Sequence, residues 1–143
     1  MIKVELSVVV NRPLPEVFAF ITDPANNPKW QEGLVESRMA SSGPMGVGTQ
    51  LTDVRKFMGR EIDSRLEVTA FEPNKTFGQK VISGPLKFEV LMNFEPSGNG
   101  TLINLVAQGE PGGFFKLAEG MVQKQLHSQL EADAQRLKRI LEG

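Results

Sequence analysis

The chain contains no cysteine and no tyrosine, and it has a single histidine, His127. Without cysteine, disulfides and thiolate chemistry are excluded, and the sequence carries no information on a redox compartment. A zinc site needs several histidine, cysteine or carboxylate ligands, so one histidine argues against it. On a helix, His127 falls at the edge of the apolar stripe and is expected at the surface. We therefore expect no metal site and no cofactor.

The chain also lacks an excess of charge and a long apolar run. Sixteen basic and 17 acidic residues give a net charge of −1, which offers no basic stripe for nucleic acid. No run reaches the roughly 18–20 apolar residues that span a bilayer, so stable membrane insertion is not expected. The first residues, Met1-Ile2-Lys3-Val4-Glu5, lead directly into a strand pattern rather than a secretory leader. The expectation is one cytoplasmic domain over residues 1–143.

Most of the chain has the pattern of short strands separated by glycine, proline, serine and asparagine turns. Alternation is clearest where Leu86, Phe88, Val90, Met92 and Phe94 share one face. The regular spacing and short loops are typical of antiparallel meanders. The predicted strands cover residues 3–10, 34–40, 48–57, 60–72, 75–83, 86–95 and 101–109.

Helices are predicted at two places. Two short ones follow the first strand: the first covers residues 15–21, and the second starts at Asp23-Pro24, a good cap and first-turn pair, and runs to Trp30. One long helix, Gly112–Leu141, closes the chain. Its apolar stripe is widened in the first half by Phe114, Leu117 and Met121, which predicts a broader buried face there. The stripe consists of Phe115, Ala118, Val122, Leu126, Leu130, Leu137 and Ile140.

This order of elements resembles the helix-grip fold of the START-like superfamily, and more closely its polyketide cyclase/dehydrase-type branch. The resemblance covers nearly the whole chain and implies an α+β fold, in which a seven-stranded antiparallel sheet curls around the C-terminal helix and leaves a hydrophobic cavity. Members of the superfamily bind lipids, hormones, polyketides or other apolar molecules, and some are enzymes. The residues that carry the resemblance are Pro13, Pro15, Val17, Phe18, Asp23, Pro24, Trp30, Gly46-Val47-Gly48-Thr49, Val68-Thr69-Ala70-Phe71-Glu72-Pro73 and Phe77.

The chain departs from the cyclase enzymes of that superfamily in one respect. Those enzymes generally place polar side chains in the cavity, often including tyrosine and arginine, whereas this chain has no tyrosine. No complete catalytic set transfers residue by residue. The cavity wall is instead expected to be apolar and aromatic, as in most ligand pockets. The predicted ligand-binding residues are Trp30, Leu51, Phe57, Phe88, Val90, Met92, Phe115, Ala118 and Val122.

Two charged residues of the third strand are candidates for a polar group inside the cavity. With regular alternation, Asp53 and Arg55 share a face with Leu51 and Phe57. If that face is buried, the pair could orient a carboxylate or carbonyl of a ligand. If Val54 marks the inward face instead, the pair is exposed.

Two carboxylates lie near the apolar stripe of the long helix. Glu119, in its first half, could reach the mouth of the pocket. Asp133 interrupts the stripe, so it needs a partner such as an arginine or a sheet hydroxyl if it is buried. For both residues a structural role competes with a catalytic one.

The leading hypothesis is binding of a small hydrophobic ligand that is lipid-, polyketide- or isoprenoid-like. It would enter between the start of the long helix and the loops near residues 57–60 and 83–86. The alternative is a cyclase/dehydratase- or isomerase-type enzyme that uses Asp53, Arg55 or Glu119 as its ionisable group. A third hypothesis is an interaction protein that pairs through a sheet edge. Monomer and homodimer both stay open.

Overall fold

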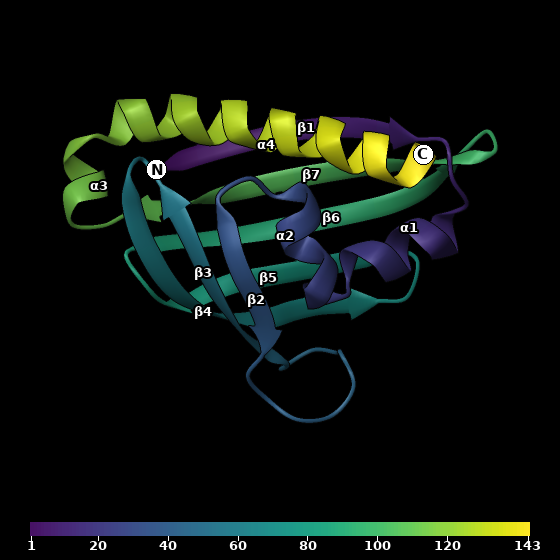
Figure 1. The fold of residues 1–143 in the computed structure, drawn as a ribbon, viewed down its shortest axis with the longest axis horizontal. Helices are drawn as coiled ribbons and strands as arrows, with labels where there is room; N and C mark the ends of the chain where they lie inside the picture. The colour runs from purple at the N-terminus through teal and green to yellow at the C-terminus, as the bar shows by residue number, and fades with distance from the viewer.

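The computed structural model describes the backbone of residues 1–143 and every side chain except that of Phe114. Seven strands form one antiparallel sheet in the order β1-β7-β6-β5-β4-β3-β2 (Figure 1). The predicted seven-stranded antiparallel sheet is thereby confirmed. The strands are β1 (Ile2–Val10), β2 (Leu34–Met39), β3 (Gln50–Phe57), β4 (Arg60–Glu72), β5 (Thr76–Ser83), β6 (Leu86–Ser97) and β7 (Gly100–Pro111).

The first two strands lie at opposite edges of the sheet, and short helices carry the chain between them. α1 covers Leu14–Ile21, a 3₁₀ turn covers Pro24–Asn26, and α2 covers Asn27–Trp30. The Asp23 carboxylate caps the turn by accepting a hydrogen bond from the Ala25 N–H at 3.0 Å. Short helices between the first and second strands are as predicted from the proline and cap signals.

The closing helix differs from the prediction at its start. The sequence predicts one helix from Gly112, whereas a short α3 (Phe114–Leu117) ends at Ala118, which has a φ of −108° and a ψ of 29°. The long helix α4 (Glu119–Glu142) follows. The prediction of a broader buried face is wrong, because Leu117 is 91% exposed and Met121 is 66% exposed. The break at Ala118 changes the direction of the chain between α3 and α4. Phe114 was also predicted to widen the buried face, but its side chain lies outside those that the structure describes.

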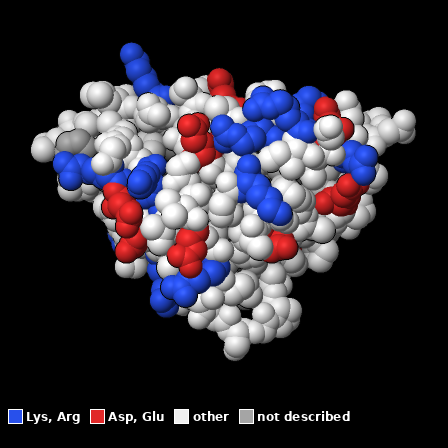
Figure 2. Space-filling model, in the orientation of Figure 1, with Lys and Arg blue, Asp and Glu red and all other residues white. Residues whose placement is uncertain are grey.

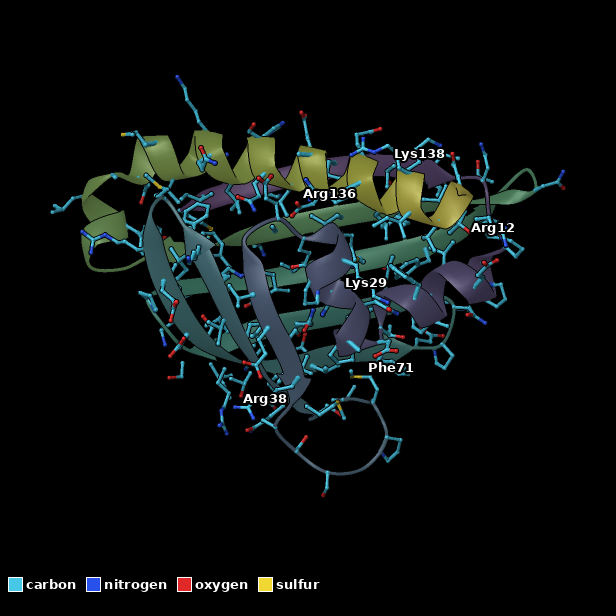
Figure 3. The ribbon with its side chains drawn as sticks, viewed as in Figure 1. Arg12, Lys29, Arg38, Phe71, Arg136 and Lys138 are labelled. Atoms are coloured by element: carbon cyan, nitrogen blue, oxygen red, sulfur yellow. The ribbon has the colours of Figure 1, made fainter. Side chains whose placement is uncertain are left out.

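The long helix lies along β1 over the concave side of the sheet and is fixed by polar contacts with backbone carbonyls (Figures 1 and 3). The Lys138 Nζ atom donates to the Val9 carbonyl at 2.7 Å. The Arg136 Nη1 atom donates to the Trp30 carbonyl at 3.0 Å. These contacts join α4 to β1 on one side and to α2 on the other.

Two apolar clusters pack between the sheet and the helices. In the larger one, the Phe18 ring of α1 lies 5.1 Å from Phe94 and 5.5 Å from Phe71 in edge-to-face arrangements. The smaller one includes Phe57 and Phe115, whose ring centroids are 5.8 Å apart. Leu126 of α4 packs against both clusters. The two clusters therefore meet at Leu126 of α4.

The outer surface mixes both signs of charge. On the face shown in Figure 2, lysines and arginines alternate with aspartates and glutamates over the helix and the strands. Among the described residues, no helix is long and apolar enough to span a membrane.

Candidate functional site

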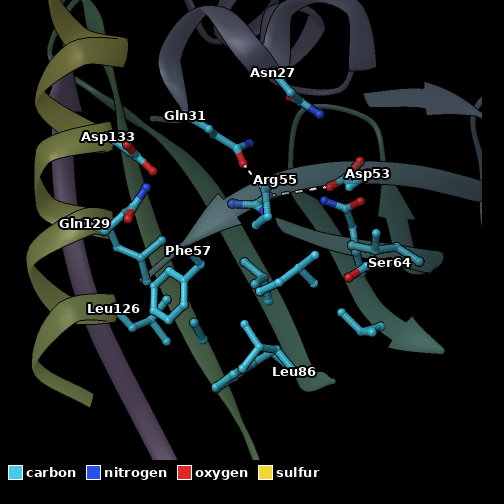
Figure 4. A pocket seen from close by; sticks show the side chains of 18 of the residues that line it. Asn27, Gln31, Asp53, Arg55, Phe57, Ser64, Leu86, Leu126, Gln129 and Asp133 are labelled. Atoms are coloured by element: carbon cyan, nitrogen blue, oxygen red, sulfur yellow. Dashed lines mark hydrogen bonds and ion pairs between the residues drawn. The ribbon is translucent and has the colours of Figure 1, made fainter. Parts of the chain in front are cut away.

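A cavity of about 160 Å³ lies between the concave face of the sheet and α4 (Figure 4). Its wall is built from α2, from strands β3 to β7 and from α4. Most of the wall is apolar because alternate residues of antiparallel strands share a face. Six of the nine predicted ligand-binding residues line it: Trp30, Phe57, Phe88, Val90, Met92 and Val122.

The other three predicted wall residues lie outside the cavity lining. Leu51 shares the face of Asp53 but is fully buried within the larger apolar cluster. Phe115 packs against the ring of Phe57, away from the cavity. Ala118 lies at the break between α3 and α4, where the helical periodicity used to predict its direction is interrupted.

Asp53 and Arg55 lie together at one end of the cavity, as Figure 4 shows. The Arg55 Nη2 atom lies 3.6 Å from the Asp53 Oδ2 atom and donates to the Gln31 Oε1 atom at 3.1 Å. Of the two orientations open from the sequence, the structure has the one in which both side chains face inward. Gln31 ties this pair to the segment that follows α2. The charged groups are thus fixed from two elements, which favours recognition of a polar group.

The surroundings of the Asp53 carboxyl make its ionisation less favourable than in water. Burial raises its pKa above the ordinary value, while the Ser37 hydroxyl and the Arg55 guanidinium partly oppose that effect. Ser37 is the residue paired with Asp53 across the β2–β3 ladder. Its oxygen also accepts a hydrogen bond from Asn27 Nδ2 at 3.3 Å.

A second carboxyl, Asp133 of α4, also lines the cavity. It is 3% exposed. Its Oδ1 atom accepts hydrogen bonds from the Glu32 N–H at 3.0 Å and from Arg136 Nη1 at 3.3 Å. Burial raises the pKa of Asp133 to about 6, against the opposing effects of these donors and of Arg55. The predicted need for a partner is met by an arginine one turn along the same helix.

The third candidate, Glu119, is not part of the cavity lining. It lies in the first turn of α4, and its carboxylate oxygens are 3.8 Å from the Met1 amino group and 3.9 Å from Lys116 Nζ. These ion pairs are at the surface. The helix break at Ala118 places Glu119 outside the regular stripe from which its direction was inferred.

Several polar residues of the wall were not predicted from the sequence. Gln129 lies on α4 one turn before Asp133. Both residues interrupt the apolar stripe of the helix, and this interruption is the sequence signal that could have identified Gln129 as a wall residue. Ser64 and Gln79 lie on strands where polar residues on the inward face break the alternation. The remaining ones are Asn27 and Gln31, which come from a segment too short for a periodicity argument.

The histidine is at the surface, as predicted. His127 lies on the outer side of α4, with its Nε2 atom 2.8 Å from the Glu131 Oε1 atom one turn later. Within the part of the chain whose side chains are described, no group of three histidines and carboxylates is arranged to hold a metal ion.

The fold matches many solved structures along its whole length. One is a START superfamily protein from Mycobacterium smegmatis, with a TM-score of 0.80 and 19% identity over 98% of this chain and 97% of that one. Another is a conserved protein from Geobacillus kaustophilus, with a TM-score of 0.80 and 16% identity over 98% and 95%. A protein from Thermus thermophilus has a TM-score of 0.75 and 18% identity over 96% and 98%.

A sequence comparison with curated proteins found no significant match. A family model described as polyketide cyclase / dehydrase and lipid transport matches residues 1–142. With the sheet, the long helix and the cavity in place, the chain belongs to this polyketide cyclase/dehydrase and lipid transport family, and its fold is like that of the START superfamily protein.

Proposed function

We propose that the protein binds a small, mainly apolar molecule in the cavity between the sheet and α4. The observation that carries this proposal is the division of the wall into two ends. Leu86 lies at one end, while Asp53 and Arg55 lie at the other (Figure 4). Ligand pockets commonly combine a largely apolar wall with a few fixed polar groups. The family description, which includes lipid transport, supports the same class of ligand.

The volume of the cavity limits the size of the ligand. About 160 Å³ is close to the roughly 150 Å³ cavity lined by Leu, Ile and Phe that binds benzene in another protein. It is below the roughly 300–1,000 Å³ of pockets for drug-sized ligands. The cavity in this conformation therefore suits a single ring or a short branched chain, and a longer molecule requires side chains of the wall to move.

Toluene is a suitable first probe because it has one ring and no polar group. We expect saturable binding in a calorimetric titration of the full chain. Val90→Phe places a ring in the cavity, because Val90 lines the wall on β6. Leu91→Phe adds the same ring at the next residue, whose side chain is on the other face of the sheet and is partly exposed. We expect Val90→Phe to weaken toluene binding at least about tenfold and Leu91→Phe to leave it within about twofold.

Comparison of toluene binding by the two variants tests whether the cavity is the binding site. Loss of binding in Val90→Phe alone supports the cavity as the site. Equal loss in both variants, or equal retention in both, contradicts it, as does the absence of saturable binding to the unmodified chain. Circular dichroism of both variants checks that the fold is kept.

An enzymatic function is the second candidate, and the two buried carboxyls favour it. Burial raises the pKa of both Asp53 and Asp133, that of Asp133 to about 6, and both residues line one cavity; buried carboxyls with a raised pKa are a common feature of groups that transfer protons in enzymes. The reaction would be dehydration or isomerisation of a small carbonyl compound. The test is a β-hydroxyketone with one phenyl ring, which loses water to give a strongly absorbing conjugated ketone. Turnover above buffer that falls at least about tenfold in Asp53→Asn supports this function, and turnover equal to buffer contradicts it.

A further inference from the structure

Asp133 is a buried carboxyl in the wall of the cavity, and its two oxygens differ. Oδ1 accepts hydrogen bonds from the Glu32 N–H at 3.0 Å and from Arg136 Nη1 at 3.3 Å. Oδ2 has no hydrogen-bond partner among the described residues, and it is not one of the unpaired atoms that are fully shielded from solvent. The side chain is 4% exposed and points from α4 towards the cavity (Figure 4). These contacts fix one oxygen and leave the other at the cavity surface.

The neighbours of Asp133 hold its position but do not fully compensate its charge. Arg136 is shared, because its Nη2 atom also lies 3.5 Å from the Glu32 carboxylate. Arg55, on β3, favours the ionised form of Asp133, but its ion pair is with Asp53. The Asp133 carboxylate therefore depends on contact with water in the cavity for part of its stabilisation.

An apolar molecule in the cavity removes that contact. Leu130 and Leu126 line the wall on the same helix, one and two turns before Asp133. The cavity measures about 160 Å³, so a molecule with one ring fills most of it and displaces water from the wall. Loss of water destabilises a carboxylate far more than a neutral carboxyl. Binding of an apolar molecule and protonation of Asp133 therefore favour each other.

We propose that the cavity couples the binding of an uncharged apolar molecule to the protonation of Asp133, so that the protein holds the molecule more tightly in weak acid than in weak base. This inference rests on the proposed binding function. Burial already raises the pKa of Asp133 to about 6 in the free protein, and a bound apolar molecule raises it further. The affinity is therefore highest where Asp133 is protonated in the free protein. It falls as pH rises through about 6, until the carboxyl is ionised in the complex as well.

Two other titratable groups are compared with Asp133. Asp53 also lines the cavity, and burial raises its pKa. Its Oδ1 atom is already fully shielded and its Oδ2 atom is ion-paired with Arg55, so a bound molecule changes its solvation less. His127 lies on the outer side of α4 beside Glu131, and histidines in general change charge between pH 5 and 8. His127→Gln is therefore the matched control for Asp133→Asn.

The test uses toluene, which has no hydrogen-bonding group, in calorimetric titrations of the full chain at pH 5 and pH 8. We expect the dissociation constant to rise about tenfold between these two values of pH. Near pH 6.5, titrations in buffers of different ionisation enthalpy should show uptake of roughly half a proton per bound toluene. In Asp133→Asn the change in affinity should fall below about twofold, whereas His127→Gln should keep the full change.

The outcomes separate this inference from the function on which it rests. Absence of toluene binding at both values of pH overturns both proposals. Equal affinity at pH 5 and pH 8, or release of protons on binding, overturns the coupling alone. A pH dependence that survives in Asp133→Asn, or that is lost in His127→Gln, belongs to another group and also overturns it.

A second measurement on the unmodified chain makes the test independent of the folding of Asp133→Asn. The ¹³C signal of the Asp133 carboxyl is followed against pH with and without saturating toluene. We expect toluene to raise the pKa of this carboxyl, because the ionised form loses its contact with water. A pKa that is unchanged or lowered by toluene contradicts the proposal.

Discussion

The Arg55 guanidinium lies 3.6 Å from the Asp53 carboxylate in the wall of a largely apolar cavity. Both side chains come from alternate positions of β3, and the pair is mostly shielded from solvent. A buried charge is tolerated only with a partner. This relationship therefore bears on stability as well as on the proposed orientation of a ligand, and each effect is measurable.

Arg55→Met should destabilise the protein more at pH 8 than at pH 5. Burial already raises the pKa of Asp53, and removal of Arg55 takes away an opposing influence. At pH 8 the carboxylate loses its counter-charge, and we expect the free energy of unfolding to fall by about 2 kcal/mol, a value reduced for the partial exposure of Arg55. At pH 5 a larger share of Asp53 is protonated and the loss is smaller. Urea denaturation at both values of pH measures the difference.

Arg38→Met is the matched control for that experiment. Arg38 lies on the neighbouring strand β2 and pairs with Glu36 at 3.2 Å, but both side chains are exposed. We expect a change within about 0.5 kcal/mol at either pH. An equal loss in both variants, or a loss in Arg55→Met that does not depend on pH, would show that the Asp53–Arg55 pair is not the cause.

Asp133→Asn should stabilise the protein progressively as pH rises through about 6. The folded-state pKa of Asp133 is raised from 3.8 to about 6. Its stabilising contribution is fully present below the unfolded value and is lost as pH rises through the folded one. Asparagine keeps the oxygen that accepts from the Glu32 N–H but does not ionise. Relative to the unmodified chain, we expect the variant to gain about 2 kcal/mol between pH 4 and pH 7.

Thermal or urea denaturation across that pH range measures the gain. Only the difference between the variant and the unmodified chain is compared, because Asp53 also has a raised pKa and contributes to both curves. A difference that stays constant from pH 4 to pH 7 would mean that Asp133 titrates alike in the folded and unfolded states.

Phe18→Ala should cost about 3–4 kcal/mol of unfolding free energy. The ring is buried and makes edge-to-face contacts with Phe71 and Phe94, which join α1 to the sheet. Val35→Ala, at an exposed position of β2, is the control and should stay within about 0.5 kcal/mol. A loss below about 1 kcal/mol for Phe18→Ala would contradict the packing described for α1.

The architecture was predictable because its signals are local and repeated. Alternation in β6 and the turn residues between strands indicated an antiparallel sheet, and Asp23-Pro24 indicated a short helix. The break at Ala118 was not predictable from the helical stripe, since residues on both sides of it are compatible with a helix. Leu117 and Met121, on either side of that break, are exposed.

The candidate site was predictable where it depends on one strand, and less so where several elements meet. Period two placed Asp53 and Arg55 on one face, although the sequence did not show which face was inward. Asp133 stood out as an interruption of an apolar stripe, but its pairing with the Glu32 backbone depends on tertiary packing between α4 and the segment after α2. Gln31 gives no sequence signal, because its role comes from its contact with Arg55.

The most direct test of the central claim is to locate a bound apolar probe on the unmodified protein. Isotope-filtered NMR with toluene measures which protein methyl groups lie next to it. The account predicts contacts with Val90, Met92 and Ala107, which line the cavity. Contacts confined to Leu117 and Met121, the exposed apolar residues near the helix break, would contradict it.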